Sequence, residues 1–201
     1  MLFRCNTGGG KIIRGYTGSE WDHVAMVLKF GSDEDEVFLI EATGKRGVHL
    51  KKFSVIIPHI GKFYEKVAWR KLNFKRKNAN LDKLDTFVEE AVGCKYKFRG
   101  RDLARSRTKK FDKEGERKFI DSDRTFFCSE LVAKAFKVCE ITEDNDEDGS
   151  NNYMPGHFTV KNKEKIKFIN DITADDEKTI VFDSMPKCLE TKYGSYGNEY
   201  L

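Results

Sequence analysis

The spacing of the apolar residues changes along the chain, and this change limits the possible folds more than any other feature. Two strand-like runs, 23–30 and 37–42, flank an acidic turn at 31–36. This arrangement is typical of a β-hairpin. Further strand candidates are 2–5, 47–50, 53–57, 66–72, 166–169 and 179–182. Together these runs predict a mostly antiparallel sheet.

After Asn80 the spacing becomes helical. Apolar residues then recur three and four positions apart over 81–92, which places them on one face of a helix. A second apolar stripe over 129–139 predicts another helix. We therefore expect an α+β fold in which an antiparallel sheet packs against helices.

The composition favours a single globular domain. The chain has 201 residues, of which 39% are hydrophobic and 35% charged. It contains no apolar run of 18 residues and no signal-peptide pattern. We expect one domain over 1–201, cut from a longer chain, with a basic insertion at 95–123 and a C-terminal tail at 184–201.

The five cysteines are scattered, at positions 5, 94, 128, 139 and 188, and form no close pair of the kind that binds zinc. Their odd number and spacing favour reduced thiols in a cytoplasmic protein. We expect no metal and no organic cofactor.

Cys128 immediately precedes the helical pattern that begins at Ser129. A cysteine at a helix N-terminus lies near the positive end of the helix dipole and near unpaired backbone N–H groups, and both favour the thiolate. The same N–H groups could hold the oxyanion of a tetrahedral intermediate. The alternative is that Cys128 is a small buried residue in an apolar run.

His23 begins the first strand-like run, and Glu41 lies near the end of the next, so a hairpin could place them side by side. Asp22 would point to the opposite face, which makes Glu41 the better partner. A carboxylate there would orient the imidazole and stabilise its protonated form opposite a thiolate. The alternative is a half-exposed histidine and a solvated glutamate.

Three segments resemble the permuted papain-like enzymes of the NlpC-like superfamily, particularly the YiiX-like branch. They are Trp-Asp-His-Val-Ala-Met-Val at 21–27, Phe-Leu-Ile-Glu-Ala-Thr at 38–43 with Gly-Val at 47–48, and Phe-Cys-Ser-Glu-Leu-Val at 127–132. The third is the most specific. The Pro-Gly segment at 153–158 is also similar to one that follows the nucleophile helix in that branch. The resemblance covers roughly 2–158.

The resemblance implies a circularly permuted papain-like fold, with Cys128, His23 and Glu41 matching the catalytic triad of the family. It implies a cysteine-dependent hydrolase that cleaves an amide (peptide or acyl amino acid) or ester through an acyl-cysteine. One alternative is a lipid acyltransferase or thioesterase of the lecithin:retinol acyltransferase type. Another is a non-catalytic domain of this fold that binds lipid or protein.

The basic insertion suggests a further partner. From Lys95 to Lys118 there are eleven Lys or Arg and four Asp or Glu. Such a segment could attract an anionic membrane surface, although a solvated loop is the simpler interpretation. We expect no nucleic acid partner. The substrate is expected to be a peptide, an acyl amino acid or a lipid.

Several other sequence patterns give only weak indications of a binding or catalytic site. Residues 144–149 match the first half of an EF-hand loop, but the position that requires a bidentate Glu is Pro155. Gly8 to Lys11 lack the spacing of a phosphate-binding loop, and we expect a mobile loop near the cleft. Tyr16 and Tyr96 are candidates to line that cleft. No role is assigned to His49, His59 or His157.

Overall fold

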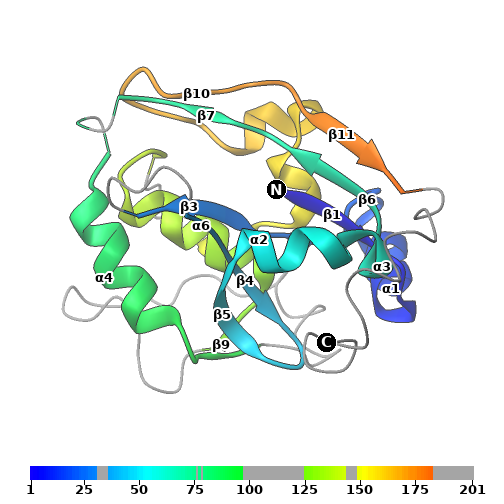
Figure 1. Cartoon of the computed structure of the whole chain (residues 1–201). Coiled ribbons are helices and arrows are strands. Elements are labelled where there is room, and N and C mark those ends of the chain that lie inside the picture. The colour runs from blue at the N-terminus through cyan, green and yellow to red at the C-terminus, as the bar shows by residue number, and fades with distance from the viewer. Residues whose placement is uncertain (31–35, 76, 78, 97–124, 144–148, 183–201) are drawn as a thin grey trace.

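The computed structural model describes residues 1–30, 36–75, 77, 79–96, 125–143 and 149–182 (Figure 1). Antiparallel sheets and several helices form this part of the chain, which confirms the predicted α+β class. The tail at 184–201, the EF-hand-like residues 144–148 and all but the first two residues of the basic insertion lie outside the described residues.

The larger sheet has the strand order β11-β6-β1-β2 and is antiparallel throughout. Its strands are β1 (Leu2–Cys5), β2 (His23–Val24), β6 (Tyr64–Trp69) and β11 (Lys178–Val181). Leu2 and Phe3 of β1 are almost fully buried. Because β1 pairs with β2, Phe3 lies opposite His23.

A second antiparallel sheet has the order β3-β4-β5, with β3 (Met26–Lys29), β4 (Val37–Thr43) and β5 (Gly47–Lys52). The strand predicted at 23–30 is therefore divided at Ala25. Its first part, β2, pairs with β1, and its second part, β3, pairs with β4 as the predicted hairpin. His23 consequently lies where the two sheets meet.

The glycine-rich segment predicted as a loop is instead α1 (Gly8–Thr17). Thr7 caps this helix by accepting a hydrogen bond from the Gly10 N–H, and Gly18 ends it in the left-handed conformation at φ 65°. A Cβ on Gly10 would lie 2.7 Å from a carboxylate oxygen of Asp22. The small residue therefore lets the helix pack closely on Asp22, which offsets the low helix propensity of glycine.

The strand predicted at 53–57 is also wrong. The segment forms the short helices α2 (Phe53–Ile56), η1 (Ile57–His59) and α3 (Ile60–Phe63). Phe53, Ile56 and Ile60 have helical spacing and pack into one apolar cluster with Phe3 and Leu39. Helical packing thus overrode the β-branched character of these residues.

The C-terminal half contains mostly short elements. The run predicted at 66–72 is divided into β6 and β7 (Leu72–Asn73), and β7 pairs with β10 (Thr173–Ala174). The strand predicted at 166–169 contributes only an isolated bridge between Phe168 and Thr142. The 3-10 turns of this region are η3 (Ser150–Asn152), η4 (Pro155–Phe158) and η5 (Val160–Lys165).

Two helices occupy the predicted positions, α4 (Leu81–Ala91) and α6 (Cys128–Val138). In Figure 1, α6 lies near the centre of the molecule with α4 at its side. Phe87 of α4 meets Phe126 edge to face, with 6.3 Å between ring centroids. α6 also packs against β2 and β4, so the helix that begins at Cys128 contacts the strands that carry His23 and Glu41.

A short parallel pair, β8 (Lys95–Tyr96) and β9 (Thr125–Phe126), joins the two helices to the second sheet. The Val48 N–H donates to the Cys94 carbonyl oxygen at 2.7 Å. Gly47 has φ 68°, and a side chain there would collide with that carbonyl. Gly47 thus allows β5 to hold the strand pair that leads into Cys128.

No helix among the described residues is long and apolar enough to cross a membrane.

Candidate active site

Cys128 is the first residue of α6, and Phe127 precedes it in an extended conformation. The sequence dictates this position, because the Phe127 N–H donates to the Glu130 carboxylate at 3.4 Å and so closes the first turn. Cys128 is buried, with 4% of its surface exposed. N–H groups in the first turn of a helix have no intrahelical acceptor, so the surroundings of the sulfur are positively polarised.

The structure brings His23 and Glu41 together. Nε2 of His23 lies 2.7 Å from Oε2 of Glu41, and both side chains are buried. A side-chain hydrogen bond also joins His23 to Cys128. Since Nε2 is occupied by Glu41, Nδ1 is the ring nitrogen left to face the sulfur. His23 therefore contacts both Cys128 and Glu41, the other two residues of the predicted triad.

The electrostatics of this group follow from its burial and its neighbours. Burial alone would lower the pKa of His23. The charge of Cys128, the hydrogen bond with Cys128 and the contacts with Glu41 outweigh burial and raise the pKa to about 10. Burial would raise the pKa of Glu41, but hydrogen bonds with His23 and His49 hold it well below its usual range. These interactions favour the charged imidazolium of His23 beside an ionised Glu41.

Sequence reasoning missed His49. Its Nε2 lies 3.0 Å from Oε1 of Glu41, the oxygen that His23 does not use. The register of the β4–β5 hairpin places Glu41 directly opposite His49, and Thr43 opposite Gly47. Counting back from a tight turn at 44–46 would have predicted this pair, because residues opposite one another on antiparallel strands share a face.

Tyr96, one of the two predicted cleft residues, contacts the nucleophile candidate. Burial, followed by the charge of Cys128 and a hydrogen bond with its side chain, raises the pKa of Tyr96 far above its usual value. The phenol therefore stays protonated and donates to the sulfur. Phe127 packs on the Tyr96 ring edge to face at 6.0 Å and holds it there. The other candidate, Tyr16, lies on α1.

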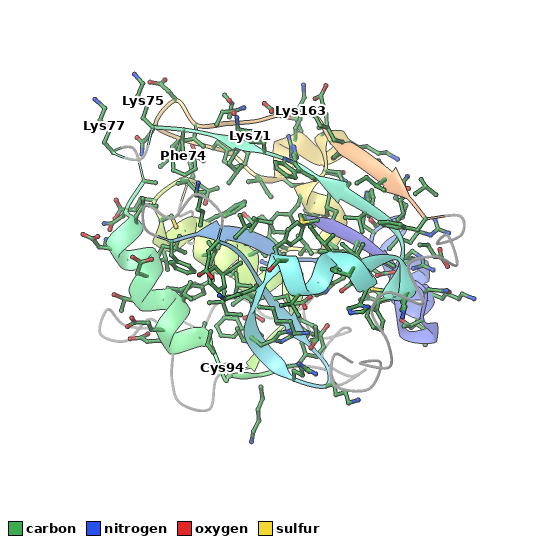
Figure 2. The ribbon with its side chains drawn as sticks, in the orientation of Figure 1. Lys71, Phe74, Lys75, Lys77, Cys94 and Lys163 are labelled. Atoms are coloured by element: carbon green, nitrogen blue, oxygen red, sulfur yellow. The ribbon has the colours of Figure 1, made fainter. Side chains whose placement is uncertain are left out.

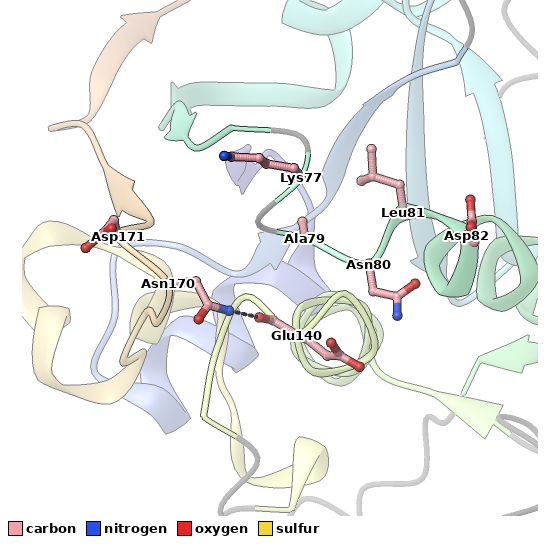
Figure 3. A pocket seen from close by; sticks show the side chains of 8 residues that line it. All are labelled: Lys77, Ala79, Asn80, Leu81, Asp82, Glu140, Asn170 and Asp171. Carbon is pink, nitrogen blue, oxygen red and sulfur yellow. Dashed lines mark hydrogen bonds between the residues drawn. The ribbon is translucent and has the colours of Figure 1, made fainter.

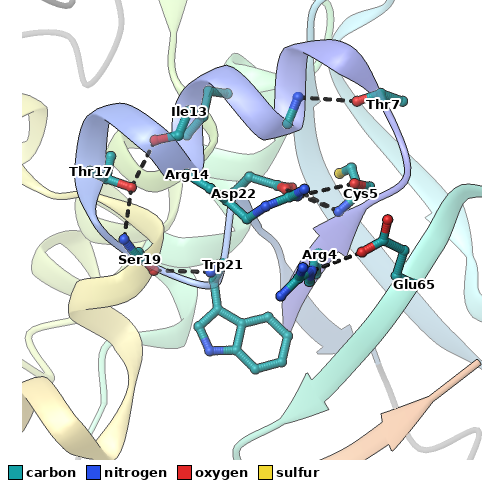
Figure 4. A network of polar contacts seen from close by, with 11 residues as sticks. Arg4, Cys5, Thr7, Ile13, Arg14, Thr17, Ser19, Trp21, Asp22 and Glu65 are labelled. Atoms are coloured by element: carbon teal, nitrogen blue, oxygen red, sulfur yellow. Dashed lines mark hydrogen bonds and ion pairs between the residues drawn. The ribbon is translucent and has the colours of Figure 1, made fainter.

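Asp22 takes no part in this group, in line with the prediction that it points away from Glu41. Its carboxylate accepts from the Cys5 N–H at 2.9 Å and pairs with the Arg14 guanidinium (Figure 4). Asp22 is 2% exposed. This buried pair fastens α1 to the end of β1, next to the strand that carries His23.

The segment after α6 is bound to the start of that helix. Ser129 Oγ donates to the Tyr153 carbonyl oxygen at 2.6 Å, which holds the turn before η4 against the residue that follows Cys128.

The two remaining histidines lie on 3-10 turns. His157 lies on η4, where its Nδ1 accepts from the Met154 N–H at 3.3 Å, and His59 ends η1. Among the described residues no group of three or more His, Cys, Asp or Glu could hold a metal ion.

Two cavities lie elsewhere. One of about 710 Å³ is open and polar, at the start of α4, where the Asn170 amide donates to the Glu140 carbonyl oxygen (Figure 3). The other, about 310 Å³, is apolar and lies between β3, β7 and the helices. Lys71 and Phe74, which flank β7, are among the residues that line it, and Figure 2 shows both well away from Cys94. Cys128 and His23 line neither cavity.

No family model, no curated protein and no solved structure matches this chain.

Proposed function

We propose that the chain is a cysteine-dependent hydrolase that cleaves an amide or ester bond through an acyl-cysteine intermediate on Cys128. The observation that carries the proposal is the position of His23, which hydrogen-bonds to Cys128 through one side of its ring and to Glu41 through the other. A buried nucleophile, base and orienting carboxylate in this order is the arrangement that acyl transfer requires.

The proposed reaction begins with the thiolate of Cys128 attacking the substrate carbonyl carbon. The carbonyl electrons move to the oxygen, and the N–H groups at the start of α6 stabilise this oxyanion. When the oxyanion collapses, the bond to the leaving nitrogen or oxygen breaks, and His23 donates its Nδ1 proton to that atom. The product of this half-reaction is a thioester on Cys128.

The second half-reaction regenerates the enzyme. Neutral His23 takes a proton from water, and the hydroxide attacks the thioester carbonyl. The second oxyanion then expels the Cys128 thiolate and releases a carboxylic acid, leaving His23 protonated. Glu41 does not exchange protons but holds the ring and stabilises the imidazolium, in keeping with its lowered pKa.

We also propose the circularly permuted papain-like arrangement as the finer description of the fold. Its support is the order of the residues along the chain, with His23 and Glu41 on strands that precede the helix of Cys128. The contacts of α6 with β2 and β4 are those that such an arrangement requires.

The two alternatives make different demands on the site. Acyl transfer uses the same thioester and replaces water with a second substrate, so it differs only in the acceptor. A binding domain has no need of a buried thiol, imidazole and carboxylate in contact. Such groups cost stability when they are desolvated, and a site of this kind is retained where it has a function.

Turnover of a panel of fluorogenic peptide amides, acyl amino acids and short-chain esters tests the proposal. Cys128→Ala and His23→Ala should remove activity, and Glu41→Gln should reduce kcat more than it changes KM. Cys139→Ala is the matched control, because it removes another buried thiol at the far end of the same helix. Turnover that survives Cys128→Ala, with the control active, would overturn the proposal.

A further inference from the structure

The carboxylate of Glu41 has two oxygens, and a different histidine contacts each of them. Oε2 lies 2.7 Å from Nε2 of His23, and Oε1 lies 3.0 Å from Nε2 of His49. The side chain of Glu41 is only 6% exposed, so little water is available to replace either contact. A rotation of the carboxylate would break both hydrogen bonds together.

His49 is itself held at both ends of its ring. Its Nδ1 lies 3.1 Å from the Gly47 carbonyl oxygen, and its side chain is 14% exposed. The Glu41 carboxylate and the Gly47 carbonyl oxygen can only accept hydrogen bonds, so His49 donates from Nε2 to Glu41 and from Nδ1 to Gly47. Gly47 is in turn fixed where β5 approaches the Cys94 carbonyl, which gives the ring a rigid support.

Resting on the proposed function, we propose that His49 is a positioning residue for the reaction, the fourth member of the series Cys128, His23, Glu41 and His49. Its Nε2–H fixes the plane of the Glu41 carboxylate, so that Oε2 stays directed at His23 Nε2. The His23 ring is then held with Nδ1 toward the sulfur. His49 contacts no reacting atom and acts only through Glu41.

Other titratable groups near Glu41 do not replace this contact. Lys51 on β5, Tyr64 on β6 and Cys5 on β1 lie within electrostatic reach of the carboxylate. The hydrogen bonds that lower the pKa of Glu41 come from the two histidines. Without His49, Oε1 would be a buried acceptor with its direct partner removed, and the carboxylate would be free to turn from His23.

Two substitutions separate hydrogen bonding from packing. His49→Leu introduces an apolar side chain of similar length and removes the hydrogen-bond donor. His49→Gln introduces an amide N–H that can still donate to Glu41. In metal sites, removing the residue that orients a metal-binding histidine typically lowers metal affinity or activity 10- to 100-fold. We expect about a tenfold loss of kcat or more in His49→Leu, little change in KM, and substantial rescue in His49→Gln.

A spectroscopic readout is independent of turnover. The proton between His23 Nε2 and Glu41 should give a strongly downfield NMR resonance that is present in the unsubstituted protein and His49→Gln and is broadened or lost in His49→Leu. Lys52→Gln is the control. Lys52 lies on the same strand as His49, but its ion-pair partner is the exposed Glu36. It should leave both the resonance and kcat unchanged.

The outcomes distinguish this inference from the proposed function. If Cys128→Ala remains fully active, the hydrolase proposal fails, whatever His49 does. If activity depends on Cys128 and His23 but His49→Leu leaves kcat and the downfield proton unchanged, His49 is not a positioning residue. Equal losses in the folded Leu and Gln variants would also overturn it, because the donor would then have no special part.

Discussion

The strongest test of the electrostatics is the replacement of Cys128 by Ser. Of the interactions that raise the pKa of His23, the charge of Cys128 and the hydrogen bond with its side chain come ahead of those of Glu41. A serine hydroxyl is close in size and still forms hydrogen bonds, but it carries no charge at neutral pH. The substitution therefore removes the anion and largely preserves the packing.

The size of the effect follows from the pKa. A value of about 10, against an ordinary 6.5, corresponds to about 5 kcal/mol in favour of the imidazolium. Burial opposes this charge, so the attraction of the two anions exceeds that net figure. Loss of the larger contribution should move the pKa of His23 back toward its ordinary value of about 6.5.

Imidazole nitrogen NMR measures this directly. The chain has four histidines, and the resonances absent from His23→Gln identify those of His23. In the unsubstituted protein His23 should stay protonated above neutral pH and lose its proton only near pH 10. In Cys128→Ser it should lose the proton at a clearly lower pH than in the parent protein. Cys139→Ser should behave like the parent protein.

The opposite result would refute the reasoning. A His23 that titrates near 6.5 in the parent protein would mean that the interactions with Cys128 and Glu41 do not outweigh burial. An unchanged high pKa in Cys128→Ser would mean that Glu41 alone is responsible, and that the contact between Cys128 and His23 is not the dominant interaction.

Three further predictions concern selectivity and stability. At neutral pH iodoacetamide should label Cys128 well before Cys139, whose pKa burial raises to about 12; peptide mapping that found the reverse order would count against an activated thiol. Asp22→Ala should lower the free energy of unfolding in urea by about 3 to 5 kcal/mol, because it leaves Arg14 without its buried partner, and a loss below 1 kcal/mol would show that the pair is solvated. Gly47→Ala should cost about 2 kcal/mol or more, since the left-handed backbone and the nearby carbonyl both oppose a side chain, and unchanged urea stability would contradict that geometry.

The sequence predicted best those elements whose apolar spacing was unambiguous. The stripes at 81–92 and 129–139 predicted α4 and α6 because the same positions pack against the core. The hairpin of β3 and β4 followed from two strand-like runs around an acidic turn. The contact between His23 and Glu41 agrees with the expected pairing, although their catalytic roles stay a prediction.

Other features depend on tertiary contacts that one sequence does not display. The division of one strand at Ala25 arises because β2 pairs with β1, a partner remote from the hairpin. α1 begins with three glycines, of which Gly10 packs so closely on Asp22 that a side chain would clash there. The contact of His49 with Glu41 is different, because the short turn at 44–46 fixes the register of β4 and β5 and would have predicted it.

The most direct test of the central claim is to trap the acyl-enzyme. The protein is mixed with an activated ester, quenched in acid within its first turnover and digested, and the modified peptide is sequenced by mass spectrometry. We predict one acyl group, on Cys128, which neutral hydroxylamine releases as it does from thioesters, and which is absent from Cys128→Ala and His23→Ala. An acyl group found on another residue, or turnover of the same ester without any adduct on Cys128, would contradict it.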